Sequence, residues 1–336
     1  MSALPSILRH SSPDEPGISR RRRGRGFSYH LPDGALLKSE RELSRIKALG
    51  LPPAYSDVWI CRDGHGHLQA VGTDDRGRRQ YRYHADWSAF RAQQKFDRLE
   101  AFGRALPRLR DRVEHDLRRN TPDRDQVCAA LIRLLDRAAL RIGSQQYADT
   151  NKTFGATTLR SRHLTLDGHT LKLAFRAKGG KRVRKQVSDR RLARVLERID
   201  DLPGHPLFTY VADDEEIRQL GSDDVNAYIA DSMGEPDGPG RFTAKTFRTW
   251  HGSVAALDYA VEADEPLTIK AMSEAAAARL HNTPSIARSS YIHPAVIELA
   301  EMEPETCAAA LGALDLRRAP NALPTHEKRL IALIAV

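Results

Sequence analysis

The stretch YSDVWICRDGHGHLQAVGTDDRGRRQYRYH, residues 55–84, contains three short runs that alternate apolar and polar residues. Asp-Gly and Arg-Gly dipeptides separate the runs, and such dipeptides are typical of turns. Because successive side chains of a strand point to opposite faces, each run predicts a strand with one buried face. Residues 55–84 therefore predict an antiparallel sheet at the centre of a β-rich N-terminal module.

The residues upstream extend this module. FSYHLPDGALL, residues 27–37, predicts a strand, a Pro-Asp-Gly turn and a second strand. SERELSRIKALG, residues 39–50, predicts a short helix with Ser39 as its N-cap. Residues 1–16 are rich in serine and proline, and we expect them to be disordered. The expected N-terminal domain is residues 17–88.

The pattern changes after the third strand-like run. Apolar residues recur every three or four positions through residues 85–117 and 124–143, which predicts amphipathic helices. A strand-like insert at 157–187 follows, with Asp-Gly and Gly-Gly turns. We therefore expect an α+β protein, in which a β-rich N-terminal domain precedes a larger, mainly helical domain at 89–320 with a small inserted sheet. Residues 321–336 form a tail.

Composition predicts a soluble protein and favours a polyanionic partner. Of the 336 residues, 40% are hydrophobic, and no apolar run approaches the roughly 20 residues that a membrane span needs. The 53 Lys and Arg against 44 Asp and Glu give a net charge of +9, a surplus common in proteins that bind phosphates. The N-terminus lacks the apolar segment of a signal peptide, and the three cysteines are widely spaced. Both features fit a cytoplasmic protein.

Two local clusters invite functional interpretations. Cys61, His65 and His67 are residue types that bind metals, but no fourth ligand stands at a familiar spacing. We therefore expect a hairpin tip there and no metal site. Arginines at 20–23 and 25 form a basic arm, for which a solvated charge run and a phosphate contact both remain open.

Four further stretches place polar residues at the edges of apolar segments. Taken singly, each residue has a common structural role, such as an arginine at a helix end or a lysine at an exposed turn. The set is Arg141 in LRIG, Lys178 in FRAKGG, Arg248 in KTFRTW, and Asn282 and Tyr291 in HNTPSIARSSY.

Together, these side-chain types suit the attack of a tyrosine on a phosphodiester. Two guanidinium groups and an amide can stabilise the charge on the non-bridging phosphate oxygens without a metal. A tyrosine must lose its proton on attack, and the departing deoxyribose oxygen must gain one. A lysine on a hairpin could supply that proton.

In this order, the motifs resemble those of the type IB DNA topoisomerases, specifically the small poxvirus-like form found in bacteria. The resemblance runs approximately from residue 18 to residue 315 and includes LPPAYSDVWI and GHLQAVGTDDRGRRQYRYH. It implies a monomer in the cytoplasm, at the nucleoid, whose two domains close around double-stranded DNA as a C-shaped clamp. It also implies that no ATP and no essential metal are needed.

The resemblance assigns a role to each site residue. Tyr291 would form a 3′-phosphotyrosyl link, after which the duplex rotates, positive or negative supercoils relax and the strand is resealed. Arg141 and Arg248 would hold the non-bridging oxygens, and Asn282 would donate a hydrogen bond to a phosphate oxygen. Lys178 would be the general acid.

Two assignments leave alternatives. Many relatives have histidine where this chain has Asn282, and His281 stands one position out of register. We favour Asn282, because one residue along a helix turns a side chain by about 100°. For the general acid, Lys181 and Lys185 are alternatives to Lys178, which the spacing in FRAK favours.

Further DNA contacts are expected from two basic segments. In the strand-like run that contains Tyr81 and Tyr83, packing of the aromatic side chains into the protein is as good an interpretation as contact with DNA. We expect Trp250 to belong to the core rather than to contact DNA. The expected contacts are Arg78, Arg79, Gln80, Tyr81, Tyr83, Lys181, Arg182, Arg184, Lys185 and Lys245.

Two other functions remain open. A tyrosine recombinase shares the chemistry, but it typically has His-x-x-Arg where this chain has Lys245-x-x-Arg248, and its N-terminal domain is helical. A catalytically silent DNA-binding relative is the second alternative, although all five site positions hold competent side chains.

Overall fold

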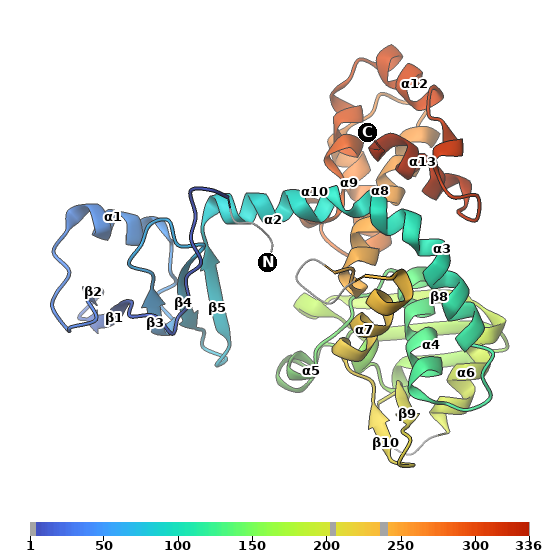
Figure 1. The fold of residues 1–336 in the computed structure, drawn as a ribbon, viewed down its shortest axis with the longest axis horizontal. Coiled ribbons are helices and arrows are strands. Elements are labelled where there is room, and N and C mark those ends of the chain that lie inside the picture. The colour runs from blue at the N-terminus through green and yellow to red at the C-terminus, as the bar shows by residue number, and fades with distance from the viewer. Residues whose placement is uncertain (1–4, 202–205, 236–240, 336) are drawn as a thin grey trace. The chain divides into compact units, whose positions relative to one another are not determined.

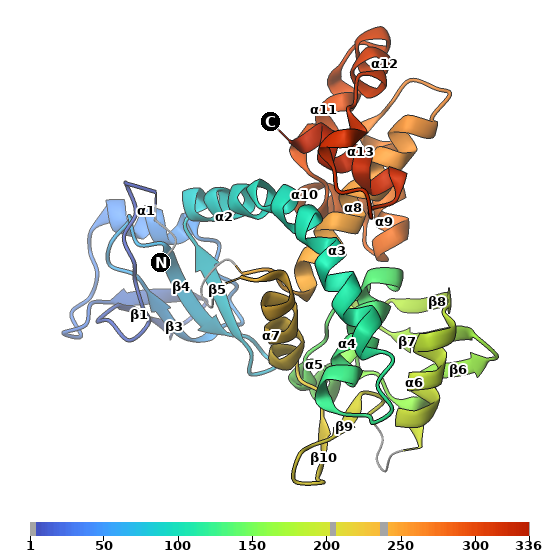
Figure 2. The same cartoon turned by 45° about the vertical axis from the view of Figure 1, so that its right-hand side comes forward.

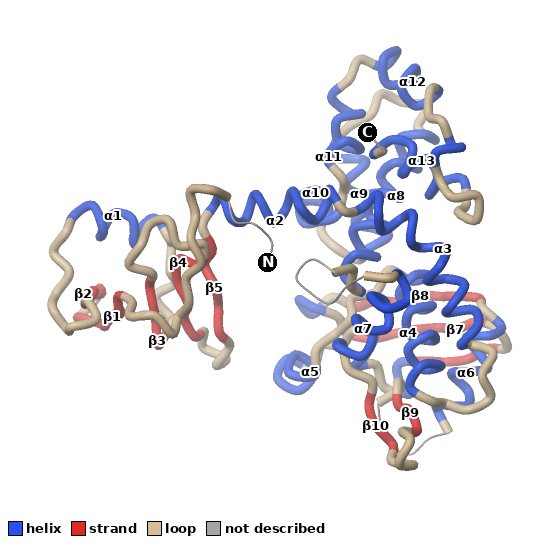
Figure 3. Tube along the Cα trace, viewed as in Figure 1, coloured by secondary structure: helices blue, strands red, loops and turns tan. Residues whose placement is uncertain are grey.

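The computed structural model describes residues 5–201, 206–235 and 241–335. Its internal contacts divide the chain into two compact units, Met1–Lys95 and Phe96–Val336 (Figure 1). Strands dominate the first unit, and helices dominate the second, which also contains a small sheet (Figure 3). This is the α+β architecture that the sequence predicts.

A five-stranded antiparallel sheet forms the first unit, in the order β2-β1-β3-β4-β5. One helix, α1, packs its buried Ile46 against Ile18 and Ile60 of the sheet. As expected, Ser39 caps this helix by accepting a hydrogen bond from the Glu42 amide. The elements are β1 (Ile18–Arg23), β2 (Gly26–His30), α1 (Glu40–Ala48), β3 (Ser56–Ile60), β4 (Leu68–Thr73) and β5 (Arg79–Tyr83).

Residues 5–16 pack against this sheet, so the disorder expected from their composition is wrong for them. Leu8 and Ser11 are buried, and the Ser11 hydroxyl donates a hydrogen bond to the Leu68 carbonyl at 2.9 Å. Arg9 and Gly66 form a backbone bridge. Composition does not report this pairing, because it depends on residues more than fifty positions away.

The second unit consists of helices around the inserted sheet β6-β7-β8. Helices α4 and α6 lie against this sheet (Figure 2). Helix α2 spans the division between the units. The elements are α2 (Ala85–Asp97), α3 (Leu99–Asp116), α4 (Arg124–Ala138), α5 (Gln145–Asn151), β6 (Leu164–Asp167), β7 (Thr170–Arg176), β8 (Arg182–Ser188), α6 (Arg190–Asp200), β9 (Thr209–Val211), β10 (Ile217–Gln219), α7 (Ser222–Met233), α8 (Ala244–Glu262), α9 (Ile269–Leu280), α10 (Pro284–Tyr291), α11 (Pro294–Glu298), α12 (Pro304–Gly312) and α13 (Thr325–Ile334), with short 3-10 turns between some of them.

Aromatic side chains of α3 and α8 form the centre of this unit. Phe102, Phe247 and Trp250 are fully buried, so Trp250 is a core residue as expected. The C-terminal tail forms α13 and belongs to the same core through Leu330 and Ile331. Of the helices that the structure describes, none is long and apolar enough to cross a membrane.

Candidate active site

The segment that follows α4 carries Arg141. Ala139 takes a left-handed conformation (φ 51°, ψ 37°) that ends the helix. The Arg141 carbonyl then accepts a hydrogen bond from the Ala156 amide at 2.8 Å. A Cβ on Gly155 would lie 2.5 Å from the Cα of Gly143, so glycine is needed for the two segments to approach. These contacts fix the backbone from which the Arg141 side chain projects.

Arg248 lies on the buried face of α8 and joins three helices. It is 3% exposed. Its guanidinium donates to the Ala139 carbonyl at the end of α4 and, at 3.0 Å, to the Leu280 carbonyl at the end of α9. Burial and the nearby Arg141 lower the pKa of Arg248 to about 10, which leaves it charged at neutral pH. Its Nε is buried and has no partner among the described residues.

His281 and Asn282 lie in the link between α9 and α10. His281 ends α9 in a left-handed conformation (φ 50°, ψ 48°), and Thr283 caps α10 by accepting a hydrogen bond from the Ile286 amide. Neither side chain is therefore set by helical geometry. The sequence argument for Asn282 over His281 assumed that both residues lie in one continuous helix. This assumption is wrong, because helix caps flank the link and interrupt the helical periodicity.

Both link side chains carry a buried nitrogen. Asn282 Oδ1 accepts a hydrogen bond from Arg141, which leaves the amide nitrogen as the donor of this side chain. In the part of the chain that the structure describes, this nitrogen and His281 Nε2 have no partner. His281 lines a small cavity together with Arg141 and Arg248. Burial and the surrounding cations lower the pKa of His281, which favours the neutral imidazole.

Tyr291, the last residue of α10, lies beside Arg248. The guanidinium carbon of Arg248 is 5.0 Å from the centre of the Tyr291 ring. Burial raises the pKa of Tyr291, but Arg248, Arg141 and Lys245 favour the phenolate, and the net effect is a lowered pKa. The Ser253 hydroxyl of α8 donates to the Tyr291 carbonyl at 3.3 Å, which holds the tyrosine backbone.

The structure thus brings Arg141, Arg248, Asn282 and Tyr291 together, from four segments far apart in the sequence. The fifth predicted residue, Lys178, is exposed at the tip of the β7–β8 hairpin, and the preceding Ala177 lines the same cavity as both arginines. This arrangement combines a phenol, two cations and buried donors at one point. It can hold an anion and activate a phenol beside it.

The alternative lysines differ in their surroundings. Lys181 is exposed. Lys185 on β8 donates from Nζ to the Arg279 carbonyl at 3.1 Å, near the end of α9. Burial and the neighbouring Arg279 and Arg248 lower the pKa of Lys185 to about 8. Lys185 therefore tethers the hairpin to the helix that carries the link.

The predicted DNA contacts on β5 divide into two groups. Tyr81 and Tyr83 are each 47% exposed and stack with ring centres 6.3 Å apart, so inward packing of these rings is wrong. Arg79 is exposed beside them. Arg78 and Gln80 instead contact the Asp74 carboxylate, at 2.7 Å and 3.0 Å. In the second unit, the exposed members of the predicted set are Lys181, Arg182, Arg184 and Lys245.

A profile of the catalytic core of eukaryotic DNA topoisomerase I matches residues 84–302, which is more than half of the chain. The chain belongs to the type IB DNA topoisomerases. A second profile, the N-terminal domain of bacterial DNA topoisomerase IB, matches residues 26–74. The enzyme class implied by the sequence motifs, a type IB DNA topoisomerase, is therefore confirmed. Both profiles are of topoisomerases, not of the alternative class, the tyrosine recombinases.

A viral relative agrees with this family. DNA topoisomerase 1B of Acanthamoeba polyphaga mimivirus is 28% identical over 303 residues, which cover 86% of this topoisomerase and 89% of the viral protein. Two solved structures of the XerH site-specific recombinase bound to difH substrates are also similar, each at 14% identity. The post-cleavage complex has a TM-score of 0.35 over 55% of this chain and 47% of that chain. The pre-cleavage complex has a TM-score of 0.38 over 63% and 53%, so this topoisomerase spans about half the length of the recombinase chains.

Proposed function

We propose that this topoisomerase cuts one strand of duplex DNA through Tyr291 and reseals it, relaxing positive and negative supercoils without ATP. The observation that carries the proposal is the position of Tyr291 beside two arginines whose charges outweigh burial and lower its pKa. A lowered pKa increases the fraction of phenolate at neutral pH, and the phenolate is the stronger nucleophile.

In the proposed cleavage step, the Tyr291 hydroxyl oxygen attacks the phosphorus of the scissile phosphodiester and loses its proton. A bond forms between this oxygen and the 3′-phosphate, and the bond from phosphorus to the 5′ oxygen breaks. The 5′ oxygen takes a proton and leaves as a hydroxyl. Resealing is the reverse reaction. The phosphotyrosyl link keeps the energy of the phosphodiester, so we propose that neither ATP nor an essential metal is needed.

The buried donors would stabilise the phosphate during attack. Each terminal nitrogen of Arg248 donates to one backbone carbonyl, so its unpartnered Nε and the second N–H group of each terminal nitrogen could donate to a non-bridging oxygen. Arg141 and the Asn282 amide would supply further donors. His281, which borders the same cavity, is a second candidate donor beside Asn282.

Lys178 is the proposed general acid. Its hairpin borders the cavity at Ala177, and two glycines follow it with positive φ of 76° and 75°, which supports a tight turn at the tip. Lys185 is tethered to α9, and we therefore prefer Lys178 for proton delivery to a 5′ oxygen.

The proposed partner is double-stranded DNA, with the two units of a monomer closing around it as a C-shaped clamp at the nucleoid. The net charge of +9 and the exposed Arg79, Tyr81 and Tyr83 of β5 support DNA binding, since arginine pairs with phosphates and aromatic rings contact bases or sugars.

Plasmid relaxation tests the proposal. Purified protein in EDTA and without ATP should relax positively and negatively supercoiled plasmid, while Tyr291→Phe should bind DNA and leave both plasmids supercoiled. The Tyr259→Phe variant, which removes a hydroxyl from an exposed tyrosine of α8, is the matched control and should relax both. Folded wild-type protein that binds DNA but relaxes neither plasmid would instead be a catalytically silent relative.

A further inference from the structure

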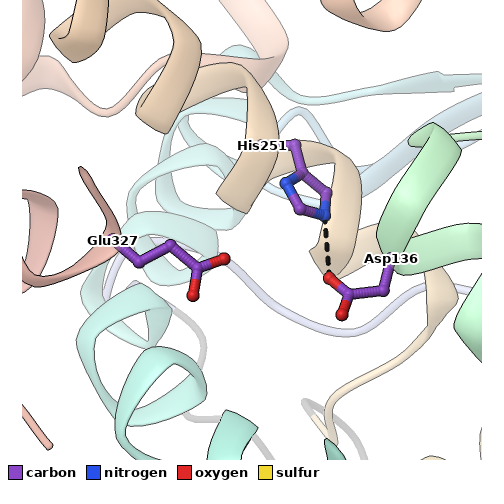
Figure 4. Close-up of side chains that lie close together, drawn as sticks. All are labelled: Asp136, His251 and Glu327. Carbon is purple, nitrogen blue, oxygen red and sulfur yellow. Dashed lines mark hydrogen bonds and ion pairs between the residues drawn. The ribbon is translucent and has the colours of Figure 1, made fainter. Parts of the chain in front are cut away.

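A buried polar cluster lies outside the proposed active site, between α3, α4, α8 and α13. Asp136, His251 and Glu327 are all buried, and their side chains point toward one another (Figure 4). His251 Nε2 is 3.1 Å from Asp136 Oδ1, and Trp250 Nε1 donates to Glu327 at 3.1 Å. Arg110 of α3 completes the cluster.

The cation of this cluster is Arg110. The two carboxylates and the imidazole are close enough to hold a metal ion, but the Arg110 guanidinium already engages both carboxylates. It donates to the two oxygens of Asp136 at 2.8 and 3.0 Å and to the two oxygens of Glu327 at 2.6 and 2.7 Å. The pKa of Asp136 is held well below its usual range despite burial, through His251 and Arg110. The Arg110 guanidinium therefore bridges the two carboxylates and offsets part of their negative charge.

The cluster lies next to the backbone segments that position Arg141 and Arg248. Asp136 is three residues before Ala139, whose carbonyl accepts the Arg248 hydrogen bond. His251 is three residues after Arg248 on the same helix, which is less than one turn away. Arg279 at the end of α9 donates to the Arg137 carbonyl at 3.0 Å, so α9 is tied to the same turn of α4.

We propose that Arg110, Asp136, His251 and Glu327 are positioning residues for strand cleavage. Through them, the C-terminal helix α13 supports the geometry of Arg248 and of the segment that carries Arg141. This inference rests on the proposed function. It assigns the 321–336 segment a role in catalysis that a tail merely docked on the core would not have.

Glu327→Gln is the most specific test of the cluster, because it removes one carboxylate charge, keeps the side-chain size and leaves Arg110 paired with Asp136. We expect single-turnover cleavage of a DNA duplex at saturating protein to slow about tenfold or more, since small misplacements of catalytic groups are costly. The Kd for the same DNA should change less than about twofold, because the Glu327 side chain is buried in the core. The control is Ile331→Ala, which removes buried apolar atoms from α13 and none of the hydrogen bonds of the cluster.

Two measurements decide between positioning and plain stability. If Glu327→Gln cleaves at the wild-type rate below its unfolding temperature, or slows only as much as an equally destabilised Ile331→Ala, the inference is wrong. Amide hydrogen exchange provides a readout that needs no activity. Glu327→Gln should speed exchange at the end of α4 and around Arg248 more than Ile331→Ala does, and equal exchange in the two variants would overturn the inference. Absence of cleavage by the wild type would count against the proposed function alone.

Discussion

Unpartnered buried donors are the most informative side-chain feature of this topoisomerase. Arg248 Nε, the Asn282 amide nitrogen and His281 Nε2 have no partner in the described residues. Leaving a buried polar group unpaired costs about 1–3 kcal/mol, so three such donors in one place favour a site that an anion completes. The sequence predicted the residue types but not this geometry, because the left-handed end of α9 at His281 is a backbone feature.

Substitution of the two link residues distinguishes the phosphate donor. We expect Asn282→Ala to slow single-turnover cleavage by about 100-fold, the usual loss when one preorganised donor is removed from a developing charge. We expect His281→Ala to slow it less than Asn282→Ala does. DNA binding should be retained in both variants. A larger loss in His281→Ala than in Asn282→Ala would reverse the assignment.

Lys185 makes stability depend on pH. Its pKa is lowered to about 8 in the folded protein, whereas a lysine in an unfolded chain has a pKa of about 10.4. Between these values the unfolded chain binds more protons, so the free energy of unfolding rises with pH through this window. In Lys185→Met this rise should be smaller by roughly 1–2 kcal/mol.

Urea unfolding near pH 7.5 and pH 10 checks this prediction. Lys270→Met, which removes an exposed lysine of α9, is the control and should retain the wild-type rise. The same pH dependence in Lys185→Met and in the wild type would show that Lys185 keeps an ordinary pKa.

Helix α8 organises the site, since it carries Arg248 and holds Tyr291 through Ser253. Strands were well predicted where alternation is local, as in residues 55–84, which contain β3, β4 and β5. The order of residues 5–16 was missed, because their partners are distant in sequence. The close packing of α8 against α10 also left no local pattern that the sequence could reveal.

Gly252 tests this packing. A Cβ at this position would lie 2.6 Å from the Tyr291 carbonyl oxygen and 3.0 Å from its Cβ. Gly252→Ala should therefore displace Tyr291 and slow cleavage by about 10-fold or more, with DNA affinity nearly unchanged. Gly312→Ala places its methyl in open space and is the control. Equal cleavage rates of both variants would show that α10 tolerates the displacement.

The β1–β2 hairpin provides a test of DNA binding. Arg20 donates to the Pro52 and Tyr55 carbonyls and is structural. The remaining arginines of the arm, Arg21, Arg22, Arg23 and Arg25, are exposed. We expect their joint replacement by alanine to weaken DNA binding. The slope of log K for DNA binding against log salt concentration should become shallower by up to about 0.9 for each lost phosphate contact.

A matched variant separates position from net charge. It replaces four exposed arginines that have acidic partners within the chain, and it should leave the salt slope close to that of the wild type. The four are Arg104, Arg124, Arg218 and Arg317. If both variants make the salt slope equally shallow, the hairpin makes no special contact and the effect comes from net charge.

For the molecule as a whole, the order of motifs along the chain predicted the family and four of the residues that the structure brings together. Arg141, Arg248, Asn282 and Tyr291 are contributed by segments up to 150 positions apart, so no local pattern could show their proximity. The Arg110–Asp136–His251–Glu327 cluster was missed for the same reason. Its members have no motif, and only packing of α13 on the helical core makes Glu327 part of it.

The covalent link is the most direct test of the proposed chemistry. A duplex with a nick just downstream of the cleaved phosphate would trap the intermediate, because the short 5′-hydroxyl fragment diffuses away. Proteolysis and mass spectrometry of the trapped protein should find the DNA 3′-phosphate attached to the peptide that contains Tyr291. A trapped DNA adduct on any other residue, or trapping by Tyr291→Phe, would contradict the assignment of Tyr291 as the nucleophile.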